Sequence, residues 1–228
     1  MKRRWIFLVW ILIFPLVSYA DDFYLGGSEG GDSRQSALNT MFAQVDKQYP
    51  RYLDQIFHQS ADPVVGNPNG SITLVEFIDY QCPYCIKMAP VVDNLIRANA
   101  NLRVVFKEFP IRGPMSQLAA KMALAAKKQG KYYAFHRAVM GLHRSLTESV
   151  LFSTAKTVGL DINQLKTDLN SPDVTALLKS QHQLAQNLGL RGTPTFFIGK
   201  TNGTSANTTR ILFGEHTQSS LQKVIANR

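Results

Sequence analysis

The chain of 228 residues carries 25 Lys and Arg against 16 Asp and Glu, and 45% of its residues are hydrophobic. This length is enough for one domain with a full hydrophobic core, or for a compact domain with an appendage, so small size alone does not call for disulfide bonds. The positive charge is moderate, and its densest part lies on a strongly helical stretch without interleaved surface aromatics. That arrangement indicates a solvated helix face and excludes an obvious nucleic-acid-binding surface. The residues concerned are Lys121, Lys127, Lys128 and Lys131.

The first twenty residues have the pattern of an export signal. Lys2, Arg3 and Arg4 precede an apolar run over residues 5–17, and a small-x-small junction ends at Ala20. The run is shorter than the roughly 20 residues that a membrane-spanning helix needs, so we expect cleavage after Ala20, with an uncleaved anchor as the alternative. Asp21 cannot carry a lipid. The mature chain is therefore expected to be soluble in an oxidising compartment, which in a bacterium is the periplasm.

A flexible leader and a helical extension are predicted ahead of the main domain, together over residues 21–61. Residues 21–35 are rich in Gly, Ser and Asp, which is typical of a flexible segment. Apolar residues then recur at steps of four and three, with Pro50 expected to kink or restart the helix. This stripe can fold back on its own domain, or it can pair with the same helix of a second copy, giving a homodimer through residues 36–58. The stripe consists of Leu38, Phe42, Val45, Tyr49, Tyr52 and Ile56.

The segments that follow predict a strand, a helix and a parallel strand. The turn-rich stretch DPVVGNPNG leads into SITLVEFIDY, a buried strand expected to end at Tyr80. Residues 86–100 have helical composition, with Pro90 expected to kink the helix, and LRVVFKEF at residues 102–109 is typical of a second strand. A strand, a helix and a strand in this order make a right-handed parallel unit.

Helices fill the next part of the sequence before short strands resume. Ser116 is expected to open an Ala-rich helix that stops at Gly130, Thr147 to cap the next, Asp161 to form a capping box with Gln164, and Ser171-Pro172 to open a helix closed by Gly189. Strands are predicted at residues 195–199 and 210–214, followed by a helix at about 218–226. The fold class is therefore α/β, with a domain over residues 62–228 that carries a helical insertion at about residues 114–189.

Cys82 and Cys85 are the only cysteines in the chain, and three uses of the pair compete. A structural disulfide would close a loop of four residues, which contributes roughly 2 kcal/mol against about 4.7 kcal/mol for a loop of 100 residues. A metal site usually has four ligands, and the five histidines show no ligand spacing, so we expect neither a metal nor a cofactor. A redox dithiol fits best, because Cys82 falls at the start of a helix, where free N–H groups and the helix dipole favour a thiolate.

Glu76 supports the redox interpretation. It lies within the apolar run LVEFI, six residues before Cys82, and a carboxylate in a buried strand is costly unless it is paired, protonated or functional. We expect it to accept a proton from Cys85, the more buried resolving thiol, although a strand-edge position facing water is the alternative. A second site is predicted at RGTPTFFIG, residues 191–199, where Pro194 just precedes a strand and either a cis bond or a plain trans turn is open.

These motifs together resemble the exported thioredoxin-fold dithiol oxidases of the DsbA type, over nearly all of residues 62–226. The resemblance is carried by GNPNGSITLVEFIDYQCPYC, by EFPIRGPMS at residues 108–116, by KYYAFH at residues 131–136 and by GTPTFFIG. It implies a thioredoxin fold in which Cys82 is the surface nucleophile, Cys85 its partner, Glu76 the buried acid and Pro194 a cis-proline. It also implies that substrate peptides bind at Pro83, Tyr84, Thr193 and Pro194, with the backbone of Thr193 pairing with an extended client.

Two departures from the best-known member of that family refine the expected function. Tyr84 replaces a histidine that can help to hold the thiolate, so we expect a less oxidising couple. Thr193 ahead of the proline resembles the exported isomerases, which are dimers. The expected function is oxidation of exported proteins with free thiols, with reoxidation by a quinone-linked membrane partner. A dimeric isomerase or reductase is the enzymatic alternative, and a holdase or surface-interaction protein is the non-enzymatic one. His136 is expected to be a helix-packing or surface histidine.

Overall fold

The computed structural model describes residues 31–142 and 145–228. Residues 39–228 form one compact unit, and residues 1–38 belong to a second. The expected export signal, its cleavage after Ala20 and the expected leader up to residue 30 lie outside the described residues, so they stay predictions. Within the second unit, residues 31–38 form the beginning of helix α1 (Gly31–Gln48).

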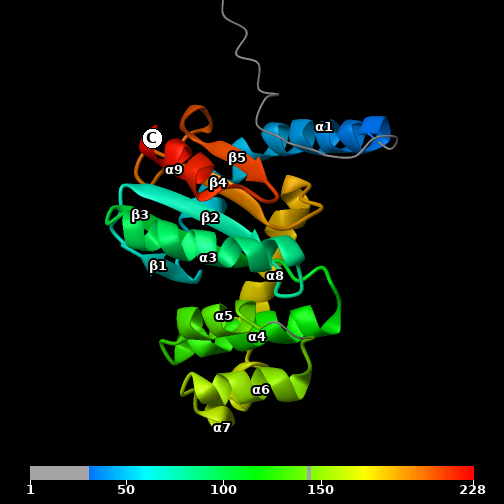
Figure 1. The fold of residues 1–228 in the computed structure, drawn as a ribbon, viewed down its shortest axis with the longest axis vertical. Coiled ribbons are helices and arrows are strands. Elements are labelled where there is room, and N and C mark those ends of the chain that lie inside the picture. The colour runs from blue at the N-terminus through cyan, green and yellow to red at the C-terminus, as the bar shows by residue number, and fades with distance from the viewer. Residues whose placement is uncertain (1–30, 143–144) are drawn as a thin grey trace, which may run out of the picture. The chain divides into compact units, whose positions relative to one another are not determined.

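A mixed five-stranded sheet organises the compact unit (Figure 1). Its strand order is β1-β3-β2-β4-β5, and β2 and β3 run parallel while the other neighbouring pairs are antiparallel. The parallel pair confirms the predicted strand, helix and strand, because α3 connects β2 to β3. The strands are β1 (Val64–Gly66), β2 (Ile72–Ile78), β3 (Leu102–Glu108), β4 (Thr195–Lys200) and β5 (Arg210–Phe213).

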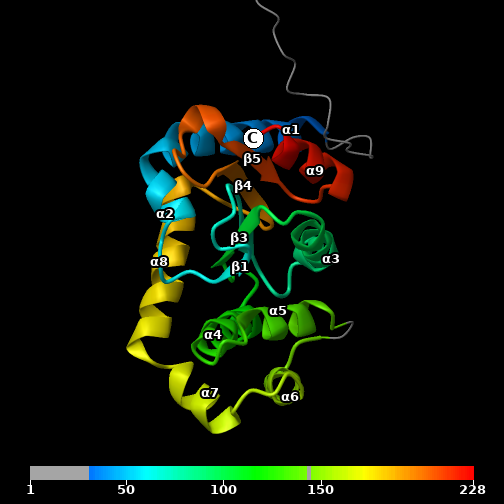
Figure 2. The ribbon, with the colours of Figure 1, turned by 90° about the vertical axis from the view of Figure 1, so that its left-hand side faces the viewer.

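Helices cover both faces of this sheet, and further helices extend beyond it. Figure 2 shows α3 (Pro83–Ala98) on one side of the sheet and α2 (Leu53–Phe57) with α8 (Pro172–Leu188) on the other. The helices of the predicted insertion are α4 (Pro114–Lys128), α5 (Tyr132–Met140), α6 (Glu148–Thr157), α7 (Ile162–Asp168) and α8, and α9 (Gln218–Ala226) ends the fold. This is the expected thioredoxin-like fold with helices inserted between β3 and β4.

Alternating side chains of β2 separate two hydrophobic clusters. Leu74 and Ile78 belong to the cluster on the side of α3, whereas Val75 and Phe77 belong to the cluster on the side of α8. Successive residues of a strand point to opposite faces, so Glu76 lies on the α3 face together with Leu74 and Ile78. The strand register thus places a carboxyl group beneath the helix that begins at the cysteines.

The apolar stripe of the N-terminal helical segment packs within its own chain. Val45, Tyr49 and Ile56 are buried in the cluster on the α8 side of the sheet, and Phe42 and Tyr52 pack against it. Pro50 coincides with the end of the regular helix, as expected: α1 stops at Gln48, a 3₁₀ turn covers Tyr49–Tyr52 and α2 restarts at Leu53. Burial in the same chain is the first of the two arrangements that the sequence allowed.

Several boundaries differ from the sequence-based expectation. Strand β1 lies in the stretch expected to be turns, because Val64 to Gly66 pair with β3 in spite of the surrounding Gly, Pro and Asn. Strand β2 ends at Ile78, and Asp79 and Tyr80 begin the turn to α3. Helix α4 starts at Pro114, because proline suits a first helical position, while Ser116 is buried and bonds a side chain elsewhere. Helix α3 continues through Pro90.

The helix caps of the insertion agree well with the sequence. Thr147 and Asp161 accept hydrogen bonds from the backbone N–H groups of Val150 and Gln164, as expected for N-caps. The reciprocal half of the capping box is not formed, because the backbone N–H of Asp161 donates to the side-chain oxygen of Gln129 at 2.9 Å. Gly189 closes α8 in the left-handed conformation that glycine adopts without strain, with φ of 77°.

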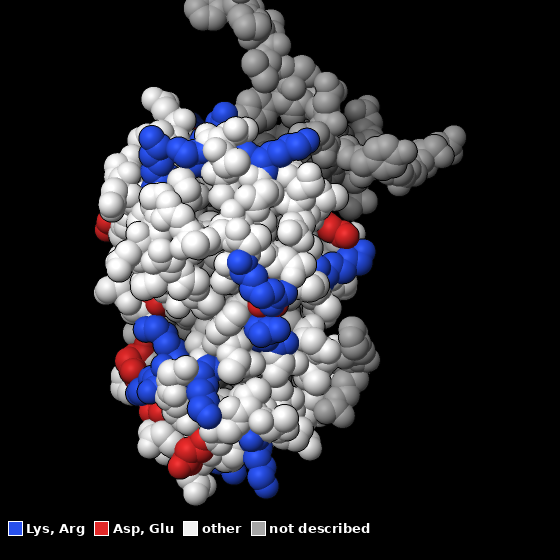
Figure 3. Space-filling model, turned by 60° about the vertical axis from the view of Figure 1, so that its left-hand side comes forward, with Lys and Arg blue, Asp and Glu red and all other residues white. Residues whose placement is uncertain are grey.

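Charged side chains are spread over the surface. Figure 3 shows Lys and Arg in several separate groups on the face drawn, with Asp and Glu between some of them. Lys128, in the basic stretch of α4, pairs with Asp168 at 2.9 Å and with Asp173 at 3.1 Å. Within residues 31–142 and 145–228, no helix combines the length and hydropathy required to cross a bilayer.

Candidate active site

The two cysteines lie at the start of α3, directly after the turn that follows β2. Cys82 is the N-cap residue in an extended conformation, and Pro83 takes the first helical position, where a missing N–H removes no hydrogen bond. Cys85 lies one helical turn on, and both residues are free thiols. The local sequence therefore places the Cys82 sulfur at the positive end of a 16-residue helix.

Cys82 is not exposed, and the expected surface position of the nucleophile is wrong for this structure. The exposed fraction is 0% for Cys82 and 1% for Cys85. Burial nevertheless acts more strongly on the pKa of Cys85 than on that of Cys82, as expected if Cys85 is the more deeply buried thiol. The physical reason for the buried position of Cys82 is the loop before β4: the Cys82 thiol donates a hydrogen bond to the backbone carbonyl of Thr193 at 3.1 Å, and the sulfur packs in the same hydrophobic cluster as Cys85.

The loop ahead of β4 lies at the same end of the sheet as the cysteines. Its Thr193–Pro194 peptide bond is cis, as the resemblance implies. Antiparallel pairing aligns Thr195 with Phe77, near the end of β2 from which the chain turns into α3. The carbonyl of Pro194 accepts from the backbone N–H of Gly214 at 2.9 Å, which holds the loop against the segment after β5. The two sequence motifs thus meet in one site.

The two thiols differ strongly in acidity. The pKa of Cys82 is lowered to about 5, chiefly by a hydrogen bond from the Cys85 thiol, while burial opposes the change. The Thr193 side chain and the backbone N–H groups of Cys85 and Tyr84 lower the pKa further. Burial raises the pKa of Cys85 well above its usual range, and its hydrogen bond to Cys82 and the charge of Glu76 add to the effect. Near neutral pH the pair therefore consists of one thiolate and one thiol.

Glu76 is buried on the α3 face of the sheet, with 2% of its surface exposed. Burial raises its pKa to about 8, and the negative charges of Cys82 and Glu108 raise it as well. The strand-edge position facing water, which the sequence left open, is therefore not observed. A carboxyl group with this pKa can both hold and release a proton near neutral pH.

Asp79 fixes the turn before Cys82, and the sequence analysis missed it. Its carboxylate is buried and accepts from the backbone N–H groups of Gln81 and Ile111 at 2.7 Å each, from that of Arg112 at 2.9 Å, and from the Ser116 hydroxyl at 2.7 Å. It thereby connects the end of β2 to the loop that opens the helical insertion. The one signal in the sequence was the position of Asp79, a charged residue directly after a predicted buried strand. Its main partners are more than 30 positions away, so local sequence does not reveal them.

A second buried carboxyl group, Glu108, was also missed. Its Oε1 atom accepts from the Tyr132 hydroxyl at 2.8 Å and from the Tyr80 hydroxyl at 3.2 Å, and Tyr80 also contacts Nδ1 of His136 at 3.3 Å. His136 is 3% exposed and stacks on Tyr132 and Tyr133, so it is the expected helix-packing histidine and not a surface residue. The available signal was a charge within the apolar run LRVVFKEF, the same signal that identified Glu76.

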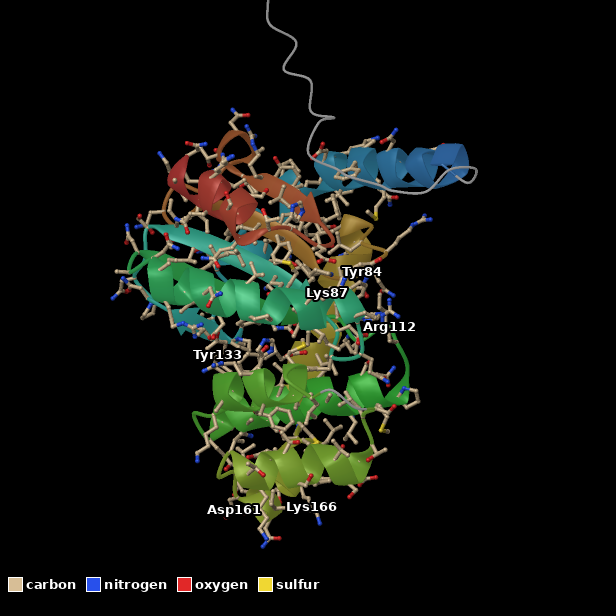
Figure 4. All side chains as sticks on the ribbon, viewed as in Figure 1. Tyr84, Lys87, Arg112, Tyr133, Asp161 and Lys166 are labelled. Atoms are coloured by element: carbon tan, nitrogen blue, oxygen red, sulfur yellow. The ribbon has the colours of Figure 1, made fainter. Side chains whose placement is uncertain are left out.

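Pro83 and Tyr84 face solvent beside the thiols. Tyr84 is 45% exposed, and the ammonium group of Lys87 lies 5.7 Å from the centre of its ring. Figure 4 shows both side chains at the N-terminal end of α3. Lys87 also pairs with Glu215 at 3.1 Å. Among the described residues, no group of three or more His, Cys, Asp or Glu side chains is arranged to hold a metal ion.

Comparisons with known proteins agree with this geometry. The DSBA-like thioredoxin domain family matches residues 73–226. A thioredoxin-like oxidoreductase from Silicibacter pomeroyi DSS-3 is 41% identical, with 76% of this chain and 95% of that chain covered and a TM-score of 0.69. The thiol-disulfide exchange protein alpha-DsbA2 from Wolbachia pipientis is 26% identical, with 84% and 97% covered and a TM-score of 0.70.

Curated relatives match over shorter stretches. A probable disulfide bond formation protein D from Bacillus cereus is 26% identical over 167 residues, which are 68% of this chain and 76% of that protein. The chain spans only about a fifth of longer relatives such as the Na(+)/H(+) antiporter NhaA 3 of Salinispora tropica, which is 29% identical over 139 residues, 60% of this chain and 21% of the antiporter. The chain therefore belongs to the DSBA-like thioredoxin domain family, whose members are thiol:disulfide oxidoreductases.

Proposed function

We propose that this protein oxidises exported proteins by transferring the Cys82–Cys85 disulfide to pairs of client thiols in the periplasm. The observation that carries the proposal is the contrast between the two sulfurs, since the pKa of Cys82 is lowered to about 5 while that of Cys85 is raised. A sulfur that is stable as a thiolate is a good leaving group, so a mixed disulfide at Cys82 resolves readily toward the client. The reduced enzyme is stabilised in the same way, which favours electron flow from client to enzyme.

The reaction proceeds through two thiol–disulfide exchanges. A client thiolate attacks Cys82, so that a client–Cys82 bond forms, the Cys82–Cys85 bond breaks, and the Cys85 sulfur receives a proton. A second client thiolate then attacks the client sulfur of the mixed disulfide and releases Cys82 as a thiolate. Two electrons have moved from the client to the enzyme, and the client holds a disulfide. Because Cys82 is buried, the client must displace the groups that cover the sulfur, among them the loop of Thr193.

Glu76 is proposed as the proton donor and acceptor for Cys85. Its pKa of about 8 leaves it mostly protonated at neutral pH in the reduced protein. It can therefore pass a proton to Cys85 as that sulfur leaves the disulfide and be protonated again from solvent, and it can accept the Cys85 proton when the pair is reoxidised. Its position on the α3 face of β2 supports this role, as does the effect of its charge on the pKa of Cys85.

Client peptides are proposed to bind across Pro83, Tyr84, Thr193 and Pro194. Pro83 and Tyr84 are exposed at the start of α3, and the Thr193 carbonyl is in hydrogen-bond contact with the reactive sulfur. An extended client segment that pairs with the Thr193 backbone would therefore bring its own sulfur next to Cys82, as in other cases of strand addition. Reoxidation is assigned to a quinone-linked membrane partner.

The balance between oxidase and isomerase or reductase depends on the reduction potential. Equilibration of the dithiol with glutathione buffers measures it, and a potential close to that of the strong oxidases supports the proposed direction. A potential near that of thioredoxin would favour the reductase instead. In the same assay, Cys82→Ser should abolish oxidation of a reduced client, whereas undiminished oxidation by this variant would reject Cys82 as the nucleophile. Retained client binding without any effect on client thiols would favour the holdase.

Assembly of two copies through residues 36–58 stays a prediction. The apolar stripe is buried within its own chain from Val45 to Ile56, so a partner copy would have to contact the part of α1 ahead of Met41, where Asn39 and Thr40 are exposed. Sedimentation of the mature chain beside a variant that lacks residues 21–40 tests this proposal. A dimer mass that falls to a monomer mass on deletion supports pairing, and a monomer mass for both excludes it.

A further inference from the structure

Glu108 ends β3 with no exposed surface and with its two oxygen atoms in different environments. Oε1 accepts hydrogen bonds from the hydroxyls of Tyr80 and Tyr132, whereas Oε2 is buried and has no hydrogen-bond partner among the described residues. A carboxylate would leave negative charge on this unsolvated oxygen, which is strongly unfavourable in a low-dielectric interior. A neutral carboxylic acid, with its proton on Oε2 and two donors at Oε1, is the less costly form, because an unpaired O–H group is cheaper to bury than an unpaired negative charge.

The register of the sheet places Glu108 next to Glu76. Glu76 pairs with Phe106 and Ile78 pairs with Glu108, so the two carboxyl groups occupy diagonal positions on neighbouring parallel strands. The alternation of both strands directs them to the same face, the one covered by α3. The charge of Glu108 acts on the pKa of Glu76, in agreement with this placement.

The groups packed around Glu108 do not neutralise a carboxylate there. The Asp79 carboxylate, at the end of β2, raises the pKa of Glu108, and burial, as the largest cause, raises it to about 8 against the effect of the two tyrosine hydroxyls. His136 of α5 is neutral, because burial lowers its pKa to about 3. From α8, Gln181 bonds the backbone N–H of Glu108 and carries no charge.

The neighbouring cations are used elsewhere. Lys107 is the next residue of β3, so its side chain points to the opposite face, where it forms an ion pair with Asp62. Arg137 of α5 is exposed and pairs with Asp93 at 3.3 Å. The groups of α3 that face the carboxyl pair are the sulfurs of Cys82 and Cys85, through their effects on Glu76. The charged groups that act on the pKa values of Glu76 and Glu108 are therefore all anionic.

We propose that Glu108 and Glu76 form a coupled carboxyl pair that takes up a proton when the Cys82–Cys85 disulfide is reduced. The inference rests on the proposed redox couple and assigns it a second proton-holding residue. A client dithiol gives up two electrons and two protons as its disulfide forms. One proton goes to the Cys85 sulfur, Cys82 stays a thiolate, and the new negative charge draws the second proton to the carboxyl pair instead of releasing it all to water.

Glu108 acts through Glu76 and is a positioning residue. Two carboxyl groups in one desolvated layer do not readily ionise together. The negative charge of either group raises the pKa of the other. Glu108→Gln keeps the shape of the neutral acid, since the amide oxygen can accept from both tyrosines and the NH₂ group takes the place of Oε2. Without the second carboxyl group, the pKa of Glu76 should be lower in both redox states. Reduction should then no longer be coupled to proton uptake by Glu76 near neutral pH.

The test is the pH dependence of the reduction potential of the full mature chain between about pH 6.5 and 8.5. Uptake of one proton per two electrons changes the equilibrium constant tenfold per pH unit. For a two-electron couple this corresponds to a change of 29.6 mV in the reduction potential per pH unit. In the wild-type protein the reduction potential should fall with pH more steeply than uptake of one proton per two electrons predicts. In Glu108→Gln the slope should correspond to about one proton per two electrons. Tyr132→Phe keeps Glu108 and the ring but removes a donor to the carboxyl, so its steep region should move to higher pH.

The outcomes separate this inference from the proposed function. Absence of any reversible Cys82–Cys85 couple would overturn the proposed function. A normal couple whose slope is the same in wild type and Glu108→Gln would overturn the carboxyl pair alone. Retained thermal stability of Glu108→Gln at pH 6.5 would show that the variant folds and that residue 108 is neutral there, whereas a large loss of stability with unchanged slope would reduce Glu108 to a structural role and overturn the inference.

Discussion

The thiol of Cys82 donates a hydrogen bond to the backbone carbonyl of Thr193, 3.1 Å away, and so connects the start of α3 to the loop of the cis-proline. This bond needs the proton of the thiol. When Cys82 becomes a thiolate, it can no longer donate, and the Thr193 carbonyl is released to accept from another group. The protonation state of Cys82 therefore controls this bond. At neutral pH Cys82 is a thiolate in the reduced form and part of the disulfide in the oxidised form, so in both forms the Thr193 carbonyl is free to pair with a client.

The first prediction concerns the acidity of Cys82. Titration of the thiolate absorbance of the reduced protein should show a midpoint near pH 5. The buried Thr193 hydroxyl has no hydrogen-bond partner among the described residues, so it is free to donate to the Cys82 thiolate. Thr193→Val removes this donor, and the loss of about 1 kcal/mol should raise the midpoint by roughly 0.7 units. Thr157→Val, at an exposed hydroxyl of α6, is a control that should leave the titration unchanged. A midpoint near that of free cysteine would contradict the proposed mechanism.

The relative stability of the two redox forms should depend on pH. The folded-state pKa of Cys82 is lowered, so the thiolate stabilises the reduced fold fully above the unfolded-state value near 9, and this contribution disappears as pH falls through about 5. At pH 7 the contribution is on the order of 3 kcal/mol. Urea unfolding of the reduced and oxidised forms at several pH values between 5 and 9 measures the difference. A difference that does not vary with pH would be inconsistent with a buried thiolate.

Glu76→Gln should stabilise the protein above neutral pH. Glu76 has a raised pKa, so its protonated form favours folding at low pH, and this stabilisation is lost as pH rises from the unfolded-state value of about 4.5 toward 8. The variant should exceed wild type by on the order of 3 kcal/mol at pH 7 and by little at pH 4. Glu215→Gln, at an exposed carboxylate, is the matched control. The same variant should slow the steps at Cys85, and unchanged exchange rates would reject Glu76 as the proton carrier.

Asp79→Asn should destabilise the region of the active site. Oδ2 of Asp79 accepts from two backbone N–H groups, and Oδ1 accepts from the Gln81 N–H and the Ser116 hydroxyl. An amide NH₂ group would face two N–H donors at Oδ2, or the Gln81 N–H at Oδ1, where the Ser116 hydroxyl could turn to Gln81. We expect a loss of about 3 kcal/mol in the free energy of unfolding. Asp161→Asn changes an exposed helix cap in the same way and should cost little, because Asn is also a good N-cap. Similar stability for the two variants would show that the Asp79 bonds do not fix the turn.

The buried ion pair of Lys107 and Asp62 predicts strong coupling between the two side chains. Lys107→Met leaves the Asp62 carboxylate buried without its counter-ion and should cost about 3–5 kcal/mol. The double variant Lys107→Met, Asp62→Leu should recover much of that loss. Lys87→Met breaks an exposed ion pair and should change stability by at most about 1 kcal/mol. Additive losses in the double variant would exclude the coupling.

The sequence predicts the parts of this site that depend on local pattern. Glu76 stands out as a charge in an apolar strand, Cys82 and Cys85 have the spacing of one helical turn, and the helix caps follow from short-range preferences. The contacts that cover Cys82 arise from Thr193, 111 positions away, so its burial could not be inferred from neighbouring residues. Strand β1 was missed for a related reason, because three residues among turn-forming neighbours become a strand only through pairing with β3.

Glu108 shows a limit of a different kind. Like Glu76, Glu108 is an acidic residue within an apolar run. However, Lys107 precedes it directly, and two consecutive charged residues are typical of the point where a strand ends in a solvated turn. Only the register of β2 and β3 reveals that the two carboxyl groups share a face while the lysine points away. Paired strands must be known before such a cluster becomes visible.

The attachment of Asp79 to residues 111, 112 and 116 also bears on how such a chain can diverge. The entrance of the inserted helices is anchored to the base of the cysteine turn by one carboxylate. Changes in the remoter helices α6 and α7 can then accumulate without shifting the reacting sulfurs. Substitutions in α6 and α7 should therefore alter the surface of the insertion more than the geometry of the cysteine turn.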